Sequence, residues 1–88
     1  MNVEQAKEII RSEALVGCVW FDENIRASSV VIRKDDSGWR LFHTDERAVP
    51  WSKSVRMYQS ESDALQDLVD RLRRRKEGAA TDRKLFGR

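Results

Sequence analysis

The hydrophobic pattern is clearest in residues 60–76, where apolar positions recur with the period of an α-helix. Ser60 and Asp63 stand at the spacing of a capping box at the start of this segment. Cations crowd its last turn, where the helix dipole favours positive charge. The apolar positions form one stripe: Ala64, Leu65, Leu68, Val69 and Leu72. The pattern predicts an amphipathic helix that lies on another layer of structure.

A second helical pattern opens the chain. Asn2 and Gln5 again stand at capping-box spacing, and Gly17 marks the expected exit from the helix. The apolar face of this helix consists of Val3, Ala6, Ile9, Ile10 and Ala14.

Between the two helices, β-branched and aromatic residues alternate as in strands. Four strands are predicted over residues 16–21, 25–34, 39–44 and 53–59. The first is apolar on both faces, which indicates a central position, whereas charges on the last indicate an edge. Short loops favour an antiparallel meander, so we expect a two-layer α+β domain with the order helix, four-stranded antiparallel meander, helix, and with both helices on one face of the sheet.

Length and charge suit a small binding protein. The 88 residues are interpreted as one domain over residues 1–76, followed by a flexible basic tail over residues 77–88. A chain this short has a thin core and little room for a deep cavity. Residues 1–70 carry a net charge of −4 and residues 71–88 carry +6, so the body is mildly acidic. Such a body is a poor surface for nucleic acid, which is not the expected partner.

No catalytic constellation is visible in the sequence. His43 is the only histidine and Cys18 the only cysteine, and neither a Ser/His/Asp set, a metal-ligand spacing nor a glycine-rich phosphate loop occurs. We therefore predict a protein that is not an enzyme and uses no cofactor or metal. A nucleophile pair of Cys18 and His43 is conceivable, because both lie on predicted strands, but Cys18 lies inside an apolar run.

The lone cysteine also bears on the compartment. It excludes an intrachain disulfide, and no apolar run is long enough for a membrane span. The N-terminus has the pattern of a helix start and not of a positively charged signal peptide. We expect a cytoplasmic protein without a membrane partner.

The candidate partner-binding residues lie in predicted loops. Trp51 follows Pro50 in the 45–52 connection and is a plausible interface anchor, because tryptophan is enriched in hot spots. Loops after the first and third strands of a meander fall at one end of the sheet, where acidic loops would attract a basic partner. The candidates are Asp22, Glu23, Asp45, Glu46, Arg47 and Trp51.

Several short motifs carry a family resemblance. They occupy residues 4–10, 15–17, 20–23, 44–48 and 64–72, together with Trp39. With these residues the chain resembles the immunity protein 59 family of bacterial polymorphic toxin systems, over residues 3 to about 75. The resemblance implies a cytoplasmic antidote that binds a cognate toxin domain stoichiometrically and occludes its active site.

One alternative function and one open question remain. The basic 71–88 segment could make the protein a small nucleic-acid-binding or regulatory module, although no aromatic residues are interleaved among its first cations. A predicted edge strand with free backbone groups allows either a monomer or an edge-strand dimer.

Overall fold

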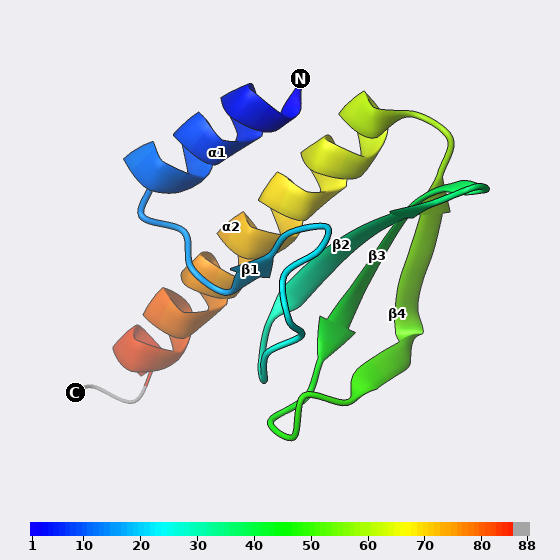
Figure 1. The fold of residues 1–88 in the computed structure, drawn as a ribbon. Helices are drawn as coiled ribbons and strands as arrows, with labels where there is room; N and C mark the ends of the chain where they lie inside the picture. Colours follow the sequence, from blue (N-terminus) through cyan, green and yellow to red (C-terminus); the bar gives the residue numbers. More distant parts are fainter. Residues whose placement is uncertain (86–88) are drawn as a thin grey trace.

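The structure, a computed structural model, describes residues 1–85 and shows two helices and a four-stranded sheet (Figure 1). The elements are α1 (Val3–Ser12), β1 (Cys18–Val19), β2 (Val30–Asp35), β3 (Gly38–Thr44), β4 (Pro50–Tyr58) and α2 (Glu61–Leu85). The strands lie side by side in the order β1-β2-β3-β4. The predicted α+β class and element order are confirmed.

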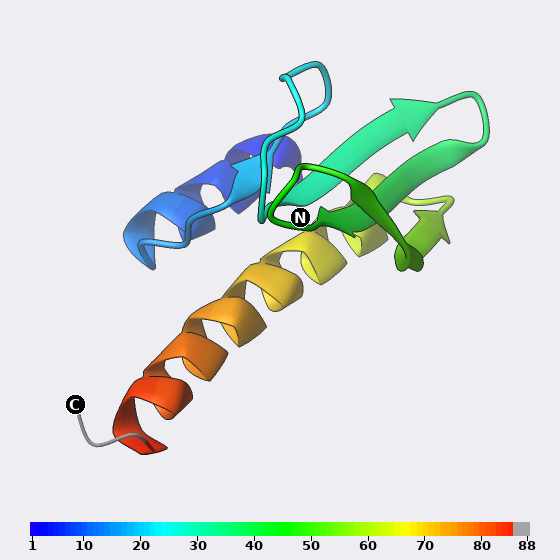
Figure 2. The ribbon, with the colours of Figure 1, turned by 90° about the horizontal axis from the view of Figure 1, so that it is seen from below.

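The main core lies between α2 and one face of the sheet. Figures 1 and 2 show α2 running along one side of the sheet, with α1 beside it. The two helices are tied together where the Arg73 guanidinium donates to both carboxylate oxygens of Glu13, at 2.9 and 2.5 Å. The cluster confirms the predicted stripe and consists of Ala6, Leu15, Val30, Ile32, Leu41, Ala64, Leu65, Leu68, Val69 and Leu72.

The predicted capping box is confirmed at the start of α1, and one of the two hydrogen bonds of such a box forms at the start of α2. The Asn2 side chain accepts from the Gln5 amide at 2.9 Å, and the Gln5 side chain accepts from the Asn2 amide at 2.9 Å. At the second helix, the Ser60 hydroxyl accepts from the Asp63 amide at 3.4 Å. α2 continues to Leu85, so the predicted helix end at residue 76 is wrong. The flexibility of the 77–88 segment stays a prediction, and residues 86–88 lie outside the described part of the chain.

The first strand differs most from its prediction. β1 has only two residues, lies at the edge of the sheet and pairs parallel with β2, so the prediction of a central strand in an antiparallel meander was wrong. Because β1 and β2 are parallel, the chain must run back along the sheet between them. Residues 25–29, which the sequence predicts as strand, belong to this connection. Within this connection, Ser28 has the left-handed backbone conformation of a turn, with a φ of 51°.

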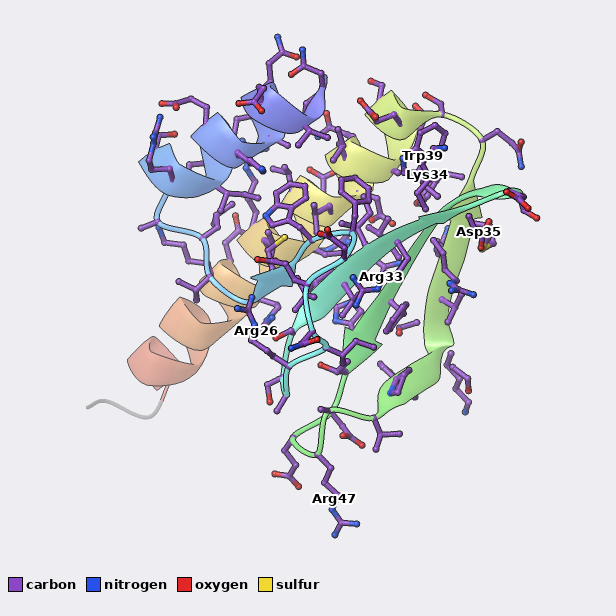
Figure 3. All side chains as sticks on the ribbon, in the orientation of Figure 1. Arg26, Arg33, Lys34, Asp35, Trp39 and Arg47 are labelled. Carbon is purple, nitrogen blue, oxygen red and sulfur yellow. The ribbon has the colours of Figure 1, made fainter. Side chains whose placement is uncertain are left out.

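Arg33 and Arg26 hold this connection against the sheet (Figure 3). Arg33 donates to the carbonyls of Trp20, Phe21 and Glu23, and Arg26 donates to the carbonyl of Cys18. These bonds supply donors to carbonyls that a regular ladder would otherwise satisfy. A second core cluster of Val19, Val31 and Phe42 lies on this face of the sheet. The apolar character of both faces of β1 therefore reflects two clusters and not a central position.

β4 begins earlier than predicted. It starts at Pro50 and includes Trp51, which the sequence pattern placed in a loop. Its predicted edge position is confirmed, and no residue of β4 is buried. The β2–β3 turn needs Gly38, which has a φ of +128° and whose added Cβ would lie 2.3 Å from the Tyr58 carbonyl oxygen.

Candidate functional site: a cationic groove between β4 and α2

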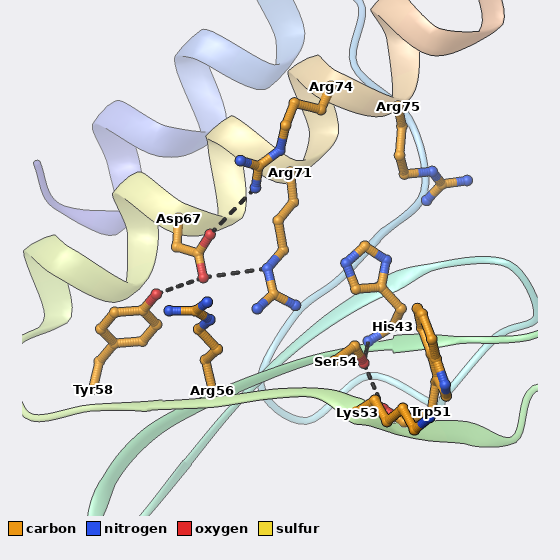
Figure 4. A pocket seen from close by; sticks show the side chains of 10 residues that line it. All are labelled: His43, Trp51, Lys53, Ser54, Arg56, Tyr58, Asp67, Arg71, Arg74 and Arg75. Carbon is orange, nitrogen blue, oxygen red and sulfur yellow. Dashed lines mark hydrogen bonds and ion pairs between the residues drawn. The ribbon is translucent and has the colours of Figure 1, made fainter.

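A groove of about 620 Å³ lies between β4 and α2 (Figure 4). β2 and β3 contribute buried residues to the core under α2, whereas β4 contributes none that is buried, and the groove lies beside this edge strand. Five cationic side chains and one carboxylate line it, together with three aromatic rings and a serine. These residues are Lys53, Arg56, Arg71, Arg74, Arg75, Asp67, His43, Trp51, Tyr58 and Ser54.

Asp67 joins the two walls of the groove. Its Oδ2 accepts from the Tyr58 hydroxyl at 2.6 Å and pairs with Arg71 Nε at 3.2 Å, while its Oδ1 lies 3.7 Å from Arg74 Nη2. Burial and the bond to the Asp67 carboxylate raise the pKa of Tyr58, so the phenol keeps the proton that it donates. One carboxylate thus fixes side chains from both β4 and α2.

Arg71 is the most enclosed charge in the groove. Its side chain is 7% exposed, and Nη1 has no hydrogen-bond partner among the described residues. Figure 4 shows the guanidinium pointing away from α2 into the groove, with the Arg56 guanidinium near it. Because a buried charged donor without an acceptor is costly, this atom is a natural contact for an added anion.

The other end of the groove is built by an irregular strand pairing. His43 pairs with Trp51 and Leu41 pairs with Arg56, so β4 has extra residues between these positions. The Ser54 hydroxyl accepts from the His43 amide at 2.8 Å and donates to the Trp51 carbonyl at 2.6 Å, which replaces part of the ladder. Such an irregularity changes the direction in which side chains leave the strand. It leaves Trp51 57% exposed at the mouth of the groove.

The lone cysteine and histidine do not form a pair. Cys18 and His43 flank Val30 from opposite sides of β2, so two strand spacings of roughly 10 Å separate them. Burial, assisted by the charge of Glu23 and opposed by Arg26 and Lys7, raises the pKa of the Cys18 thiol to about 12. The two side chains therefore do not form a nucleophile pair.

The acidic loop residues predicted as binding sites lie elsewhere. Glu23 belongs to the connection that Arg33 holds, and Arg33 pairs with Arg40 of β3. Asp45 instead follows Thr44, at the far end of β3. Four residues of strand, about 13 Å, separate those two levels. Because β1 is parallel to β2, the expected sharing of one end of the sheet by the two acidic loops does not occur.

Two of these acids bind their own loops. The Glu23 carboxylate accepts from the Trp20 amide at 2.7 Å. The Asp45 carboxylate accepts from the amides of Arg47 and Val49, at 2.8 and 3.0 Å. Asp22, Glu46 and Arg47 are exposed, and Arg47 projects from the loop tip in Figure 3. Of the six predicted site residues, Trp51 alone lines the groove.

Sequence reasoning missed the groove because its parts are far apart in the chain. The sequence pattern places the start of the basic run at Arg71 in the last turns of a helix, where the dipole favours positive charge. The aromatic residues that it lacked come from β3 and β4, as His43, Trp51 and Tyr58. The regular spacing of Asp67, Arg71, Arg74 and Arg75 on one side of α2 is the signal that could have suggested a charged surface facing the sheet.

Comparisons with known proteins assign no family to this chain. No family model matches the sequence, and neither a curated protein nor a solved structure matches it. The resemblance to the immunity protein 59 family therefore rests on the quoted motifs alone. Within the described part of the chain, no group of His, Cys, Asp or Glu side chains could hold a metal ion. None of the helices described is long and apolar enough to cross a membrane.

Proposed function

We propose that this protein is a non-enzymatic binding module that neutralises a bacterial toxin in the cytoplasm by stoichiometric binding. The partner engages β4 and the groove beside it. One observation carries the proposal: an exposed Trp51 stands at the mouth of a groove lined by Tyr58 and four arginines. Tryptophan, tyrosine and arginine are the residue types that dominate the binding energy of protein interfaces.

The rest of β4 supports a protein partner. Val49, Val55 and Met57 are 51%, 39% and 48% exposed around this strand. Large apolar side chains gathered at a sheet edge are typical of a surface that another chain covers. A second copy of this chain could cover the same edge, which is the dimer that the sequence left open.

The groove is also organised in advance. Asp67 fixes Tyr58, Arg71 and Arg74 in the free protein, so these side chains lose less freedom on binding. The acidic residues Asp22, Glu23, Asp45 and Glu46, with Arg47, remain predicted contacts at the periphery.

The test begins with the gene neighbourhood. The proposal requires a neighbouring gene for a large secreted protein with a variable C-terminal domain. That domain, purified with this protein, should form a one-to-one complex and lose its toxicity to cells. An isolated gene, a domain that does not bind, or self-association as a dimer with no toxin binding would refute the proposal.

Trp51→Ala measures the contribution of the anchor. Truncation of a central tryptophan should weaken the complex by about 2 kcal/mol, roughly thirtyfold, without affecting folding because Trp51 is exposed. Val16→Ala is the matched control, since Val16 is 78% exposed and does not line the groove. Titration calorimetry with both variants checks the prediction, and equal affinities would place the interface elsewhere.

A nucleic-acid-binding module is the second candidate. The groove brings aromatic rings among the cations of α2, which is the combination used to bind single strands. In this case affinity for an oligonucleotide should fall steeply with salt and depend on Arg74 and Arg75. Absence of binding at low salt would remove this candidate.

A further inference from the structure

We propose that the groove between β4 and α2 receives a short acidic segment of a polypeptide partner, one carboxylate of which accepts hydrogen bonds from the Arg71 guanidinium. The inference rests on the proposed function for the partner being a protein. It adds the chemistry of the bound segment, which the predicted acidic loops had suggested would be basic.

The groove carries an excess of positive charge. Lys53, Arg56, Arg71, Arg74 and Arg75 face one carboxylate, that of Asp67. Cations held this close in a partly enclosed space repel one another, and an incoming carboxylate relieves that repulsion. The groove is therefore complementary to negative charge although residues 1–70 as a whole carry −4.

Arg71 has a buried donor without an acceptor among the described residues. Asp67 engages Nε, which leaves the outer edge of the guanidinium for a second acceptor. Nη1 is buried without a partner among the residues described, in a side chain that is 7% exposed. A planar fork of N–H donors fits a carboxylate well, so a Glu or Asp of the partner completes this site.

The surroundings of the groove favour a polypeptide over a nucleic acid. Acidic loops flank both ends of the groove. The Asp45–Glu46 loop precedes Pro50 near Trp51, and the Asp35–Asp36 hairpin ends at Gly38, next to Trp39, which pairs with Tyr58. Figure 3 shows Arg47 of the first loop and Asp35 of the second at opposite ends of the sheet. A continuous polyanion leaving the groove would meet like charge, whereas a polypeptide can carry its acids only where the cations lie.

Trp51 defines the neighbouring position of the segment. Its indole is exposed beside the cations, so it offers an apolar surface to the residue next to the acid. The expected segment thus alternates acidic and apolar side chains.

The probe is a short labelled peptide of alternating Glu and Leu, titrated by fluorescence anisotropy at low ionic strength. Two control ligands are titrated in the same way: the same peptide with Gln in place of Glu, and an oligouridylate of equal length. The Glu peptide should bind and the Gln peptide should not. Absence of Glu-peptide binding, or tighter binding of the oligouridylate, overturns the inference.

Matched variants locate the binding. Arg56→Gln should weaken Glu-peptide binding about tenfold, the loss expected for one hydrogen bond to a charged group. Arg40→Gln removes the same charge from an exposed arginine on the opposite face of the sheet and should have little effect. Equal losses from the two variants would mean non-specific attraction and would overturn the inference.

Arg71 needs a gentler substitution because it is buried. Arg71→Lys keeps the charge but loses the fork, so it should weaken peptide binding about as much as Arg56→Gln, in protein shown to be folded by circular dichroism. His43 supplies a readout in the unmodified protein. It is the only histidine, and a carboxylate bound beside it should raise its pKa, which proton NMR follows directly. An unchanged His43 pKa with saturating peptide would place the peptide outside the groove.

The two proposals fail separately. A toxin complex that depends on Trp51 but shows no affinity for the Glu peptide would reject the acidic segment and keep the proposed function. Peptide binding without any toxin complex would reject the proposed function and keep the affinity of the groove for an acidic segment.

Discussion

At the scale of single residues, His43 reports the electrostatics of the groove. Burial lowers the pKa of its imidazole below 6.5, and the charges of Arg71, Arg75 and Arg74 lower it further, while Asp67 acts in the opposite direction. Lys53 of β4 lines the same space and adds positive charge. The imidazole is therefore neutral at neutral pH, although it lies beside a tryptophan and several arginines.

This shift makes stability depend on pH. A base with a lowered pKa in the folded state binds fewer protons than the unfolded chain between that pKa and 6.5. The His43 contribution is thus fully present above 6.5 and is lost progressively as the pH falls to the lowered pKa. Urea unfolding on either side of pH 6.5 should show the loss in the wild type and a smaller one in His43→Gln. Identical pH profiles would contradict the assigned cause.

At the scale of elements, the contact between β4 and α2 depends on one carboxylate. Asp67 accepts from Tyr58 across the interface and neutralises Arg71 on its own helix. The edge strand has no buried residue of its own, so this polar contact adds to the packing of the half-buried Tyr58 against the main cluster.

Asp67→Ala should therefore destabilise the fold strongly. It leaves the buried Arg71 guanidinium without a counter-charge, which costs about 3 kcal/mol. Tyr58→Phe removes one hydrogen bond and should cost about 1 kcal/mol. Glu8→Gln, which breaks an ion pair of exposed side chains with Arg11, is the control and should cost less than about 1 kcal/mol. Chemical denaturation measures all three, and an Asp67→Ala cost as small as that of the control would show that Arg71 is hydrated.

At the scale of the whole molecule, the sheet joins two hydrophobic clusters into one domain. Val30 and Ile32 enter the cluster under the helices, while Val31 between them enters the cluster on the other face. Leu41 and Phe42 divide in the same way. Because consecutive residues of β2 and β3 serve opposite faces, neither cluster can separate without breaking the strands.

The protein should therefore unfold in a single transition. Leu68→Ala in the main cluster and Phe42→Ala in the small one should each cost about 3 kcal/mol, and each should shift the whole transition. Circular dichroism and tryptophan fluorescence should give coincident curves for both variants. Separate midpoints for the two probes in Phe42→Ala would show that the small cluster unfolds by itself.

Sequence reasoning succeeded where neighbouring residues decide the structure. The capping box of Asn2 and Gln5 lies within one helical turn, and both of its hydrogen bonds form as the spacing predicts. The apolar stripe of Ala64, Leu65, Leu68, Val69 and Leu72 likewise repeats within a few helical turns, and it forms part of the main core. For the candidate site, the same reasoning singled out Trp51, which lines the groove, but placed it in a loop and not in β4.

It failed where distant groups decide. Residues 25–29 have the composition of a strand, yet Arg33 and the turn at Ser28 make them part of a connection that reverses the direction of β1. This reversal also separates the acidic loops that a meander would have brought together.

The sequence by itself determined the two amphipathic helices and the presence of β-forming segments between them, because these follow from periodicity within a few residues. Only the tertiary structure decided the direction of β1, the bare edge of β4 and the cationic groove. The groove requires Trp51 and Arg56 from a strand to stand opposite Arg71 from a helix, and such a meeting depends on packing between elements that no local pattern encodes.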